Sequence, residues 1–256
     1  MRPHCLLLFL AGARASRFLI LRHGETNHNA AGIIQGSSDI SRLTEKGHEQ
    51  ARAAGIAIAA KSDLANIDRT FVSSLTRAQQ TLDGVAAASK LPLPQATVLS
   101  ELREIDLGSW EGRDKAELTK AFPDAYYAWK DDSLGFEVDG NYPVVDLWAR
   151  ARVAWAAMRS SDGSVDGMTL VVTHNACGQA LLCTALGLDA TNFRRFEFPN
   201  CGAAEVELNS AGEAARWRWR LPEEGEWCTA AECKIGGSSE ATGIRFGLCH
   251  PPPHGC

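Results

Sequence analysis

Short apolar runs alternate with amphipathic stretches along most of this 256-residue chain. The runs Phe18–Leu21, Thr70–Ser73 and Met168–Thr173 are largely apolar, which is typical of strands buried on both faces of a sheet. Apolar positions at helical spacing follow each run. Helices are predicted at Glu45–Lys61 with Thr44 as N-cap, from Ser74 as N-cap to Ser89, from Pro143 through Met158, and at Ala176–Leu186. This order predicts an α/β fold, in which helices cover both faces of a mostly parallel sheet.

Other patterns fill the rest of the chain. Apolar and polar residues alternate over 204–208 and again over 216–220, and residues 209–213 read as a turn between them. The pattern predicts a half-exposed hairpin at a C-terminal edge of the sheet. Residues 27–41 are rich in Asn, Gly and Ser and are expected to form a loop. Residues 101–140 are less regular and predict two short helical stretches rich in aromatics.

Composition changes at both ends of the patterned region. Residues 1–17 combine three arginines with an apolar stretch and no acidic residue, which fits either an irregular extension or the remnant of a targeting sequence. Residues 223–256 are rich in Gly, Ser, Glu and Pro, and we expect a poorly ordered tail there. Between them, residues 18–222 are expected to form one domain.

Composition and charge disfavour several classes of function. The 31 acidic residues outnumber 26 Lys and Arg, giving a net charge of −5, which argues against a general nucleic-acid binder. The longest apolar run, Cys5–Ala11, is far shorter than the roughly 18 residues typical of a membrane span. The eight cysteines contain no C-x-x-C pair, and the Cys and His residues of 249–256 flank three prolines, so no metal is expected. Any anionic ligand must therefore be held by a local cluster of basic side chains.

Basic side chains follow each of the three predicted strands. Arg22 and His23 come directly after the first, Arg77 lies in the helical turn after the second, and His174 follows the third. Because the carboxyl ends of parallel strands meet at one edge of a sheet, we expect these side chains to converge. Guanidinium groups offer paired N–H donors that match phosphate oxygens. The sequence therefore predicts a site for a tetrahedral dianion, with phosphate as the expected ligand.

Four motifs follow one another along the chain. They are Leu21–Thr26 (LRHGET), Ser73–Ala78 (SSLTRA), Leu102–Gly112 (LREIDLGSWEG) and Val172–Asn175 (VTHN). In type and order they resemble the histidine phosphatase superfamily, the phosphoglycerate-mutase-like proteins, and the similarity spans about Phe18–Leu208. The resemblance implies the fold of that superfamily and chemistry on a phosphoryl group, with no cofactor and no metal.

The resemblance also implies roles for the strand-end residues. His23 would attack phosphorus and hold the phosphoryl group as a phosphohistidine. Arg22, Arg77 and His174 would neutralise the phosphoryl oxygens, the term expected to dominate catalysis of phosphoryl transfer. An unperturbed histidine has a pKa of about 6.5, so a neutral imidazole is available near pH 7.

A carboxylate and a polar loop complete the implied site. Glu104 would donate a proton to the departing alkoxide and later accept one from water, with Glu101 and Asp106 as alternative carboxylates. Arg103 and Arg42 are candidates for meeting a substrate carboxylate, with a surface role as the alternative. The loop after the first motif is expected to hold phosphate through Asn29, Gln35, Gly36 and Ser37.

Further stretches resemble the plant 2-carboxy-D-arabinitol-1-phosphatases within the superfamily: Ile34–Asp39, Asp139–Pro143, Leu147–Arg152 and the residues around His174. This implies a phosphatase for a small phosphorylated sugar or sugar acid, in the chloroplast or alternatively in the cytoplasm. A phosphoglycerate-type mutase and a non-catalytic phosphoprotein-binding module remain as alternatives. Residues 107–112 resemble the phosphatases more than the mutases, and the presence of both His23 and Glu104 favours catalysis over binding alone.

Overall fold

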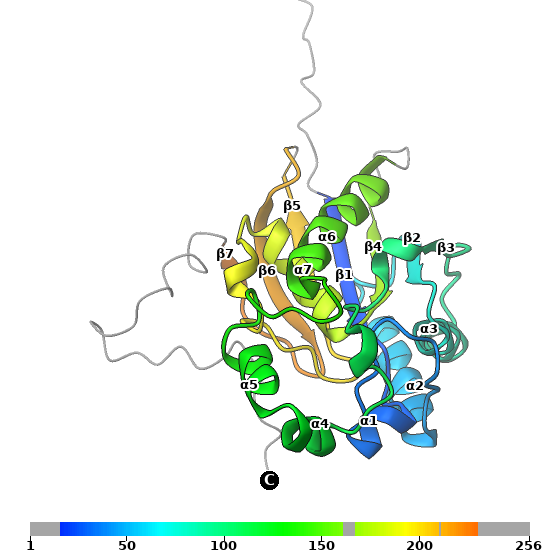
Figure 1. The fold of residues 1–256 in the computed structure, drawn as a ribbon. Coiled ribbons are helices and arrows are strands. Elements are labelled where there is room, and N and C mark those ends of the chain that lie inside the picture. The colour runs from blue at the N-terminus through cyan, green and yellow to red at the C-terminus, as the bar shows by residue number, and fades with distance from the viewer. Residues whose placement is uncertain (1–15, 161–166, 210, 230–256) are drawn as a thin grey trace, which may run out of the picture.

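The computed structural model describes residues 16–160, 167–209 and 211–229, which build a seven-stranded mixed sheet between two layers of helices (Figure 1). The strands are β1 (Ser16–Arg22), β2 (Ile67–Ser73), β3 (Thr97–Leu99), β4 (Met168–Thr173), β5 (Ala203–Leu208), β6 (Ala214–Leu221) and β7 (Cys228–Thr229). Their order across the sheet is β3-β2-β4-β1-β5-β6-β7. Strands β1 to β4 are parallel to one another. Strand β5 pairs antiparallel with β1, β6 with β5, and β7 with β6.

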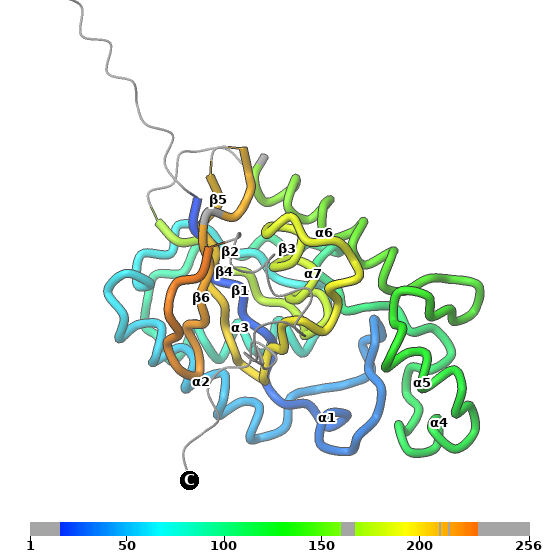
Figure 2. Tube along the Cα trace, turned by 90° about the vertical axis from the view of Figure 1, so that its left-hand side faces the viewer, coloured from blue at the N-terminus to red at the C-terminus, as the bar shows by residue number. Residues whose placement is uncertain are grey.

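The helices in the described residues are α1 (Asn27–Ala31), α2 (Glu45–Ala60), α3 (Thr76–Ser89), α4 (Lys115–Ala121), α5 (Pro123–Asp131), α6 (Pro143–Ser160) and α7 (Asn175–Ala185), with short 3₁₀ turns at Ser100–Leu102, Gly108–Trp110 and Ala190–Asn192. Of these helices, α2, α3, α6 and α7 form the two layers. Helices α2 and α3 cover one face of the sheet, and α6 and α7 cover the other (Figure 2). The predicted α/β class, a mostly parallel sheet covered on both faces, is therefore confirmed.

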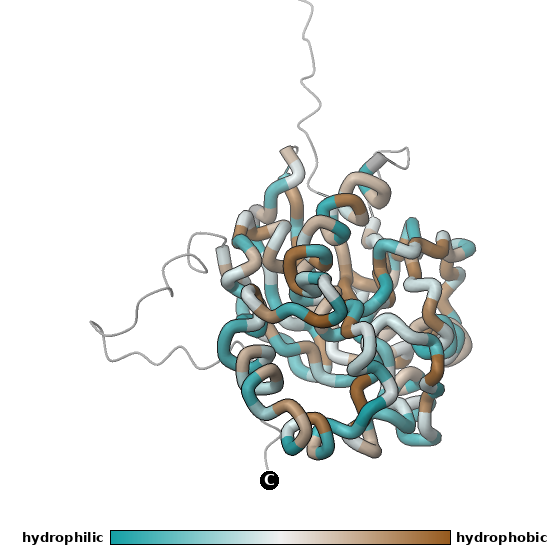
Figure 3. Tube along the Cα trace, viewed as in Figure 1, coloured by the Kyte–Doolittle hydropathy of each residue, from teal (hydrophilic) through white to brown (hydrophobic). Residues whose placement is uncertain are grey.

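The central strand β1 is buried on both faces because its side chains alternate between two hydrophobic cores. Phe18 and Ile20 pack with α6 and α7, whereas Leu19 and Leu21 pack with α2 and α3, and all four are fully buried. Burial of one such side chain contributes roughly 1.5–3 kcal/mol. Figure 3 shows hydrophobic positions concentrated along the inner elements and hydrophilic ones along the outer loops.

Two short elements were missed by the sequence patterns. Helix α1 lies inside the stretch predicted as a loop, and it buries no residue, so it leaves no apolar periodicity. A capping box stabilises it, in which the Thr26 hydroxyl accepts from the Asn29 N–H at 3.1 Å and the Asn29 side chain accepts from the Thr26 N–H. Strand β3 is three residues long and largely exposed, so it also lacks an alternating pattern.

The start of helix α3 differs from the prediction. Ser74 was expected to be the N-cap, but the helix begins at Thr76 and its N-cap is Leu75. A side chain distant in sequence provides the cap instead, because Asp39 accepts from the Thr76 N–H at 2.8 Å and from the Thr76 hydroxyl at 2.7 Å. The prediction of Ser74 as N-cap was therefore wrong.

The predicted hairpin is present as β5 and β6, but it is not half-exposed. Glu205 of β5 is fully buried, and Arg220 of β6 is 1% exposed. The Glu205 carboxylate accepts from Arg17 at 2.8 Å, from Arg218 at 3.2 Å and from Arg220 at 2.6 Å, while Asp63 takes two further bonds from Arg220. Glu205 and Arg220 thus face an ionic cluster in place of water, whereas Arg216 is exposed.

The ends of the chain are described only in part. Residues 223–229, at the start of the expected tail, include β7, whose two residues pair with β6. Residues 1–15 and 230–256, with the Cys and His residues of 249–256, lie outside the described residues. Within the described ranges, every helix is too short or too polar to cross a membrane.

The ionic cluster yields a test of stability. Replacing Glu205 by Gln keeps the shape of the side chain but leaves the buried Arg220 and its neighbours with less negative charge. We expect the free energy of unfolding to fall by about 3 kcal/mol, because removing one partner of a buried ion pair leaves a buried charge uncompensated. Urea denaturation would measure it. As a control, Glu45→Gln breaks an exposed pair with Arg52 and should cost less than about 1 kcal/mol. Equal effects of the two substitutions would contradict this account.

Candidate active site

The carboxyl ends of β1, β2 and β4 are neighbours in the sheet, and they gather the basic side chains. The His23 N–H donates to the Thr173 carbonyl at 2.9 Å, so the pairing of β1 with β4 continues past the end of β1. The imidazole rings of His23 and His174 lie with centroids 5.1 Å apart. The structure therefore brings together the residues that sequence reasoning placed at one edge.

A cavity of about 230 Å³ opens at this edge. Seven of the residues that the sequence predicted at the ligand line it: Arg22, His23, Asn29, Gln35, Gly36, Arg77 and Glu104. His174, which the sequence also predicted at the ligand, is fully buried beside His23 and is not among the residues that line this cavity. The alternative carboxylates Glu101 and Asp106 line a different, adjacent cavity. Among the described residues, no group of three or more His, Cys, Asp or Glu side chains is arranged to hold a metal ion.

His23 is held in one tautomer. Its Nδ1 lies 2.7 Å from the Gly24 carbonyl oxygen, which can only accept, so Nδ1 carries the proton and Nε2 keeps a free lone pair. Burial lowers the pKa of His23 well below its ordinary value of 6.5, and the charges of Arg22 and Arg77 lower it further. The ring is therefore neutral at neutral pH, with a lone pair on Nε2.

His174 is oriented by Ser73. The Ser73 hydroxyl oxygen lies 2.8 Å from His174 Nε2 and accepts from the Leu75 N–H at 3.3 Å, so its own proton is available to Nε2. His174 Nδ1 then carries the ring proton, and this buried atom has no hydrogen-bond partner among the described residues. Burial lowers the pKa of His174 well below 6.5, followed by the charges of Arg77, His23, Arg22 and Arg150. A neutral His174 offers one N–H donor.

Arg77 is fully buried and holds the loop that follows α1. Its guanidinium donates to the Ser38 carbonyl at 2.9 Å and to the Gly36 carbonyl at 2.8 Å. Burial lowers the pKa of Arg77 to about 10, which leaves it protonated at neutral pH. Gly36 has φ of +52°, and a Cβ there would lie 2.0 Å from the Glu111 carboxylate, so a side chain is excluded on both grounds.

Hydrogen bonds also fix the side chains of Gln35 in this loop and of Asn29 in α1. Gln35 Oε1 accepts from the hydroxyls of Thr26 at 2.9 Å and Ser41 at 2.6 Å. Asn29 Oδ1 accepts from the Thr26 N–H and from Asn200, which also donates to the His23 carbonyl at 3.1 Å. Asn200 therefore links Asn29 of α1 to the backbone of His23.

Arg22 approaches the cavity from the end of β1. Its Nη1 donates to the Phe198 carbonyl at 2.6 Å, while its Nε is buried and has no hydrogen-bond partner among the described residues. Burial lowers the pKa of Arg22, and the negative charges of Glu104 and Glu197 oppose that shift. The guanidinium thus keeps a donor for an anionic ligand.

Glu104 is fixed by the first turn of α7. Its carboxylate accepts from the N–H groups of Ala176 at 3.1 Å and Cys177 at 3.0 Å, and from the N–H of Ile105 at 3.0 Å. The charge of Glu104 opposes the lowering of the pKa of Arg77, so it lies within electrostatic reach of the arginines. Oε2 accepts one of these three bonds and is the freer oxygen for proton transfer.

Two glycines bring α2 against the catalytic loop. A Cβ on Gly24 would lie 2.4 Å from the Gly47 carbonyl oxygen, and a Cβ on Gly47 would lie 2.0 Å from the Glu25 carbonyl oxygen. Both contacts are with backbone, which cannot move aside as a flexible side chain would. The residue after His23 must therefore be a glycine as long as its loop keeps this contact with α2.

Sequence reasoning missed three cations at the mouth of the cavity. Lys115, Lys130 and Arg194 all line it, and the Arg194 guanidinium carbon lies 4.4 Å from the centre of the Trp129 ring. The pKa of Lys115 is lowered by partial desolvation and by the charges of Lys130 and Arg22. These residues follow no strand end, so the rule that found the others does not apply to them. A positive φ of 72° at Arg194 is visible only in the structure.

Arg103 and Arg42, which the sequence predicted as candidates for binding a substrate carboxylate, have other partners. Arg103 lines the adjacent cavity and donates to the Ser37 carbonyl at 2.6 Å. Arg42 donates to the carbonyls of Asp39 and Ser41 and is exposed. The structure thus places both arginines away from the cavity that His23 lines.

Comparisons with known proteins agree with this geometry. Residues 18–220 match the model of the histidine phosphatase superfamily, branch 1. A 2-carboxy-D-arabinitol-1-phosphatase of Triticum aestivum is 37% identical over 197 residues, which cover 77% of this chain and only 38% of that protein's length. A glucosyl-3-phosphoglycerate phosphatase of Mycolicibacterium vanbaalenii is 32% identical over 228 residues, covering 81% of this chain and 93% of that protein. The structure of a mycobacterial glucosyl-3-phosphoglycerate phosphatase in complex with VO3 has a TM-score of 0.68 at 28% identity, covering 80% of this chain and 97% of that one.

The two buried imidazoles predict a pH dependence of stability. In the unfolded chain each histidine binds a proton with a pKa of about 6.5, whereas the lowered pKa values of His23 and His174 keep both rings neutral in the folded state. Protons therefore favour unfolding as the pH falls below 6.5. Each residue should remove about 1.4 kcal/mol of unfolding free energy at pH 5.5 relative to pH 7.5. Urea denaturation of the wild type and of His23→Gln at both pH values would measure it, and an equal pH dependence in the two proteins would refute it.

Proposed function

Because the chain belongs to the histidine phosphatase superfamily, we propose that it hydrolyses phosphomonoesters of small sugars or sugar acids through a phosphohistidine intermediate. One observation carries the proposal. A neutral His23 with a free lone pair on Nε2 lines the same cavity as the guanidinium groups of Arg22 and Arg77. This combination provides both a nucleophile and the positive charge that a phosphoryl group requires.

In the first step of the proposed reaction, His23 Nε2 attacks phosphorus and displaces the substrate oxygen. Arg22, Arg77 and the Nδ1–H of His174 stabilise the equatorial oxygens, and they are held in place before substrate binds. Their contribution grows as charge develops, since phosphoryl transfer depends mainly on position and electrostatics. Glu104 supplies the proton that the departing alkoxide needs.

In the second step, water attacks the phosphohistidine. Glu104 now accepts a proton from that water through its freer oxygen, Oε2, and His23 leaves as the neutral imidazole it was before. The Gly24 carbonyl keeps the His23 proton on Nδ1 throughout, so Nε2 is regenerated as a nucleophile. Asn29, Gln35 and Gly36 form the loop against which the phosphoryl oxygens lie.

The mouth of the cavity supports a substrate with a second anionic group. A volume of about 230 Å³ falls below the ~300–1,000 Å³ usual for ligand pockets, which favours a small molecule. Lys115, Lys130 and Arg194 line the same cavity as Arg22, His23 and Arg77, and they add positive charge for a second anionic group. Both curated relatives are named for substrates that carry a carboxylate and a phosphate. We therefore take 2-carboxy-D-arabinitol 1-phosphate as the first candidate among phosphorylated sugar acids.

The first experiment tests the nucleophile. We expect His23→Ala to lower kcat/KM for an aryl phosphate by about a thousandfold or more, because the covalent route is lost. His48→Ala, on α2 and outside the cavity, serves as the control and should retain wild-type activity. Brief reaction with ³²P-labelled substrate should give acid-labile labelling of the wild type and none of His23→Ala.

The product and the metal requirement decide between the alternatives. A phosphatase should release free phosphate from phosphoglycerate or a sugar phosphate, equally well with and without EDTA, and vanadate should inhibit it. Formation of the isomeric phosphoglycerate without phosphate release would establish the mutase. A phosphoprotein-binding module would show neither product.

A second experiment tests the cations at the mouth. We expect Lys130→Ala to raise KM about tenfold for a phosphorylated sugar acid and to leave KM for an aryl phosphate almost unchanged, because only the first substrate carries a carboxylate. Lys120→Ala removes an exposed lysine of α4 that does not line the cavity, and it should change neither value. If Lys130→Ala affects both substrates alike, the lysine has no role in selecting a carboxylate.

A further inference from the structure

The segment that carries Glu104 separates two cavities. Glu104 and Ile105 line the cavity of the proposed active site, whereas Arg103 and Asp106 line a second cavity of about 520 Å³. Helix α6 contributes Arg150 to this second cavity, so Arg150 approaches the segment from the side opposite the substrate.

Regular backbone pairing holds little of this segment. The N–H groups of Ile105 and Leu107 donate to the carboxylates of Glu104 and Glu111, and not to backbone carbonyls. The carbonyl oxygen of Glu104 accepts from Nη2 of Arg150 at 2.9 Å. One side chain of α6 therefore fixes the peptide group that follows Glu104.

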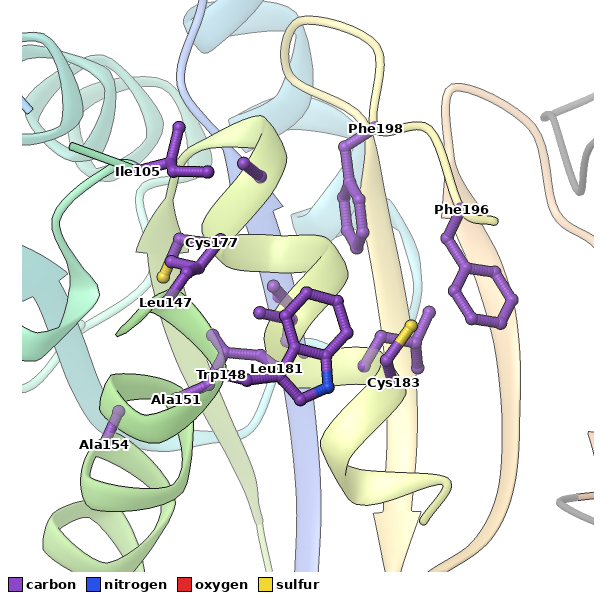
Figure 4. Close-up of a cluster of buried hydrophobic side chains, with 14 of the residues drawn as sticks. Ile105, Leu147, Trp148, Ala151, Ala154, Cys177, Leu181, Cys183, Phe196 and Phe198 are labelled. Carbon is purple, nitrogen blue, oxygen red and sulfur yellow. The ribbon is translucent and has the colours of Figure 1, made fainter. Parts of the chain in front are cut away.

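The side chain of Glu104 is fixed from the other direction. Its carboxylate is bound by the N–H groups of Ala176 and Cys177 in the first turn of α7. Figure 4 shows Ile105, Leu147 and Cys177 at this junction, and all three belong to the same buried cluster. Helices α6 and α7 pack together there, so Glu104 is held between them, its backbone by one helix and its carboxylate by the other.

We propose that Arg150 is a positioning residue that orients Glu104 for proton transfer through the Glu104 carbonyl. The inference rests on the proposed function for its kinetic consequence and on geometry alone for its structural one. A guanidinium suits the task, because its planar fork keeps a fixed direction from a helix that does not itself enter the site. The second cavity beside Arg150 leaves room for a small cation from solution to reach the same carbonyl if the side chain is removed.

The kinetic test uses two substitutions at Arg150 and a matched control. We expect Arg150→Ala to lower kcat at least tenfold with KM changed less than threefold, since the phosphate cradle stays intact. Arg150→Lys keeps a cationic donor and should retain more of kcat. Arg152→Ala, two residues along α6 and exposed, should leave both values unchanged. Guanidinium ion at millimolar concentration should raise kcat of Arg150→Ala and have no such effect on the wild type.

A double-mutant cycle tests whether Arg150 acts through Glu104. In a Glu104→Gln background, Arg150→Ala should lower kcat by less than twofold, because the group that Arg150 positions no longer transfers protons. A loss equal to that in the wild-type background would overturn the proposal. So would a wild-type kcat in Arg150→Ala.

A measurement without turnover separates this inference from the proposed function. The amide hydrogens of Ala176 and Cys177 are bound by the Glu104 carboxylate, so their exchange in Arg150→Ala should be at least tenfold faster than in the wild type and in Arg152→Ala. Unchanged exchange would overturn the role of Arg150 even if the protein were a phosphatase. Faster exchange in a protein without phosphatase activity would support the role and reject the function. If Arg150→Ala does not fold, Arg150→Lys gives both readouts.

Discussion

The site depends on positive charge held next to uncharged imidazoles in a place that water hardly reaches. Burial of a guanidinium is costly unless polar groups replace its hydration. Here the carbonyls of Phe198, Ser38 and Gly36 do so, and the carboxylate of Glu104 adds a negative charge nearby. The same burial prevents His23 from taking up a proton. Burial therefore leaves a lone pair on His23, whereas Arg22 and Arg77 stay protonated although burial lowers their pKa.

The fold supplies this arrangement from elements with separate tasks. Adjacent parallel strands deliver the cradle, and the first turn of α7 fixes the carboxylate. Helices α4 and α5 stand apart from the sheet (Figure 2) and bring Lys115 and Lys130 to the opening. In the proposed function, the reacting groups are held by the sheet, and discrimination between substrates is assigned to a segment whose changes need not disturb them.

The sequence predicted the parts of the site that depend on local patterns, and it missed those that depend on contacts between distant residues. The cradle could be predicted because the apolar runs locate the strands and parallel strands share one edge. Glu104 lies in a segment without regular structure, and only its surrounding motif identified it. Lys115 and Lys130 reach the cavity through the placement of α4 and α5, and Arg194 through the turn after residues 190–192. No periodicity encodes either placement. Glu205 was taken as a solvent-facing position, because its partner Arg17 is 188 residues away and pairing of that kind leaves no local pattern.

The facing glycines at positions 24 and 47 have a consequence for any effort to redesign the protein. A side chain at position 24 would overlap the backbone of Gly47, and one at position 47 would overlap the backbone of Glu25. A library that varies α2 freely will therefore lose its members with any larger residue at the third position of that helix. In such variants the loop after β1 would have to move away from α2. The close packing of α2 at Gly47 thus limits where the loop that carries His23 can lie, although no side chain of α2 lines the cavity.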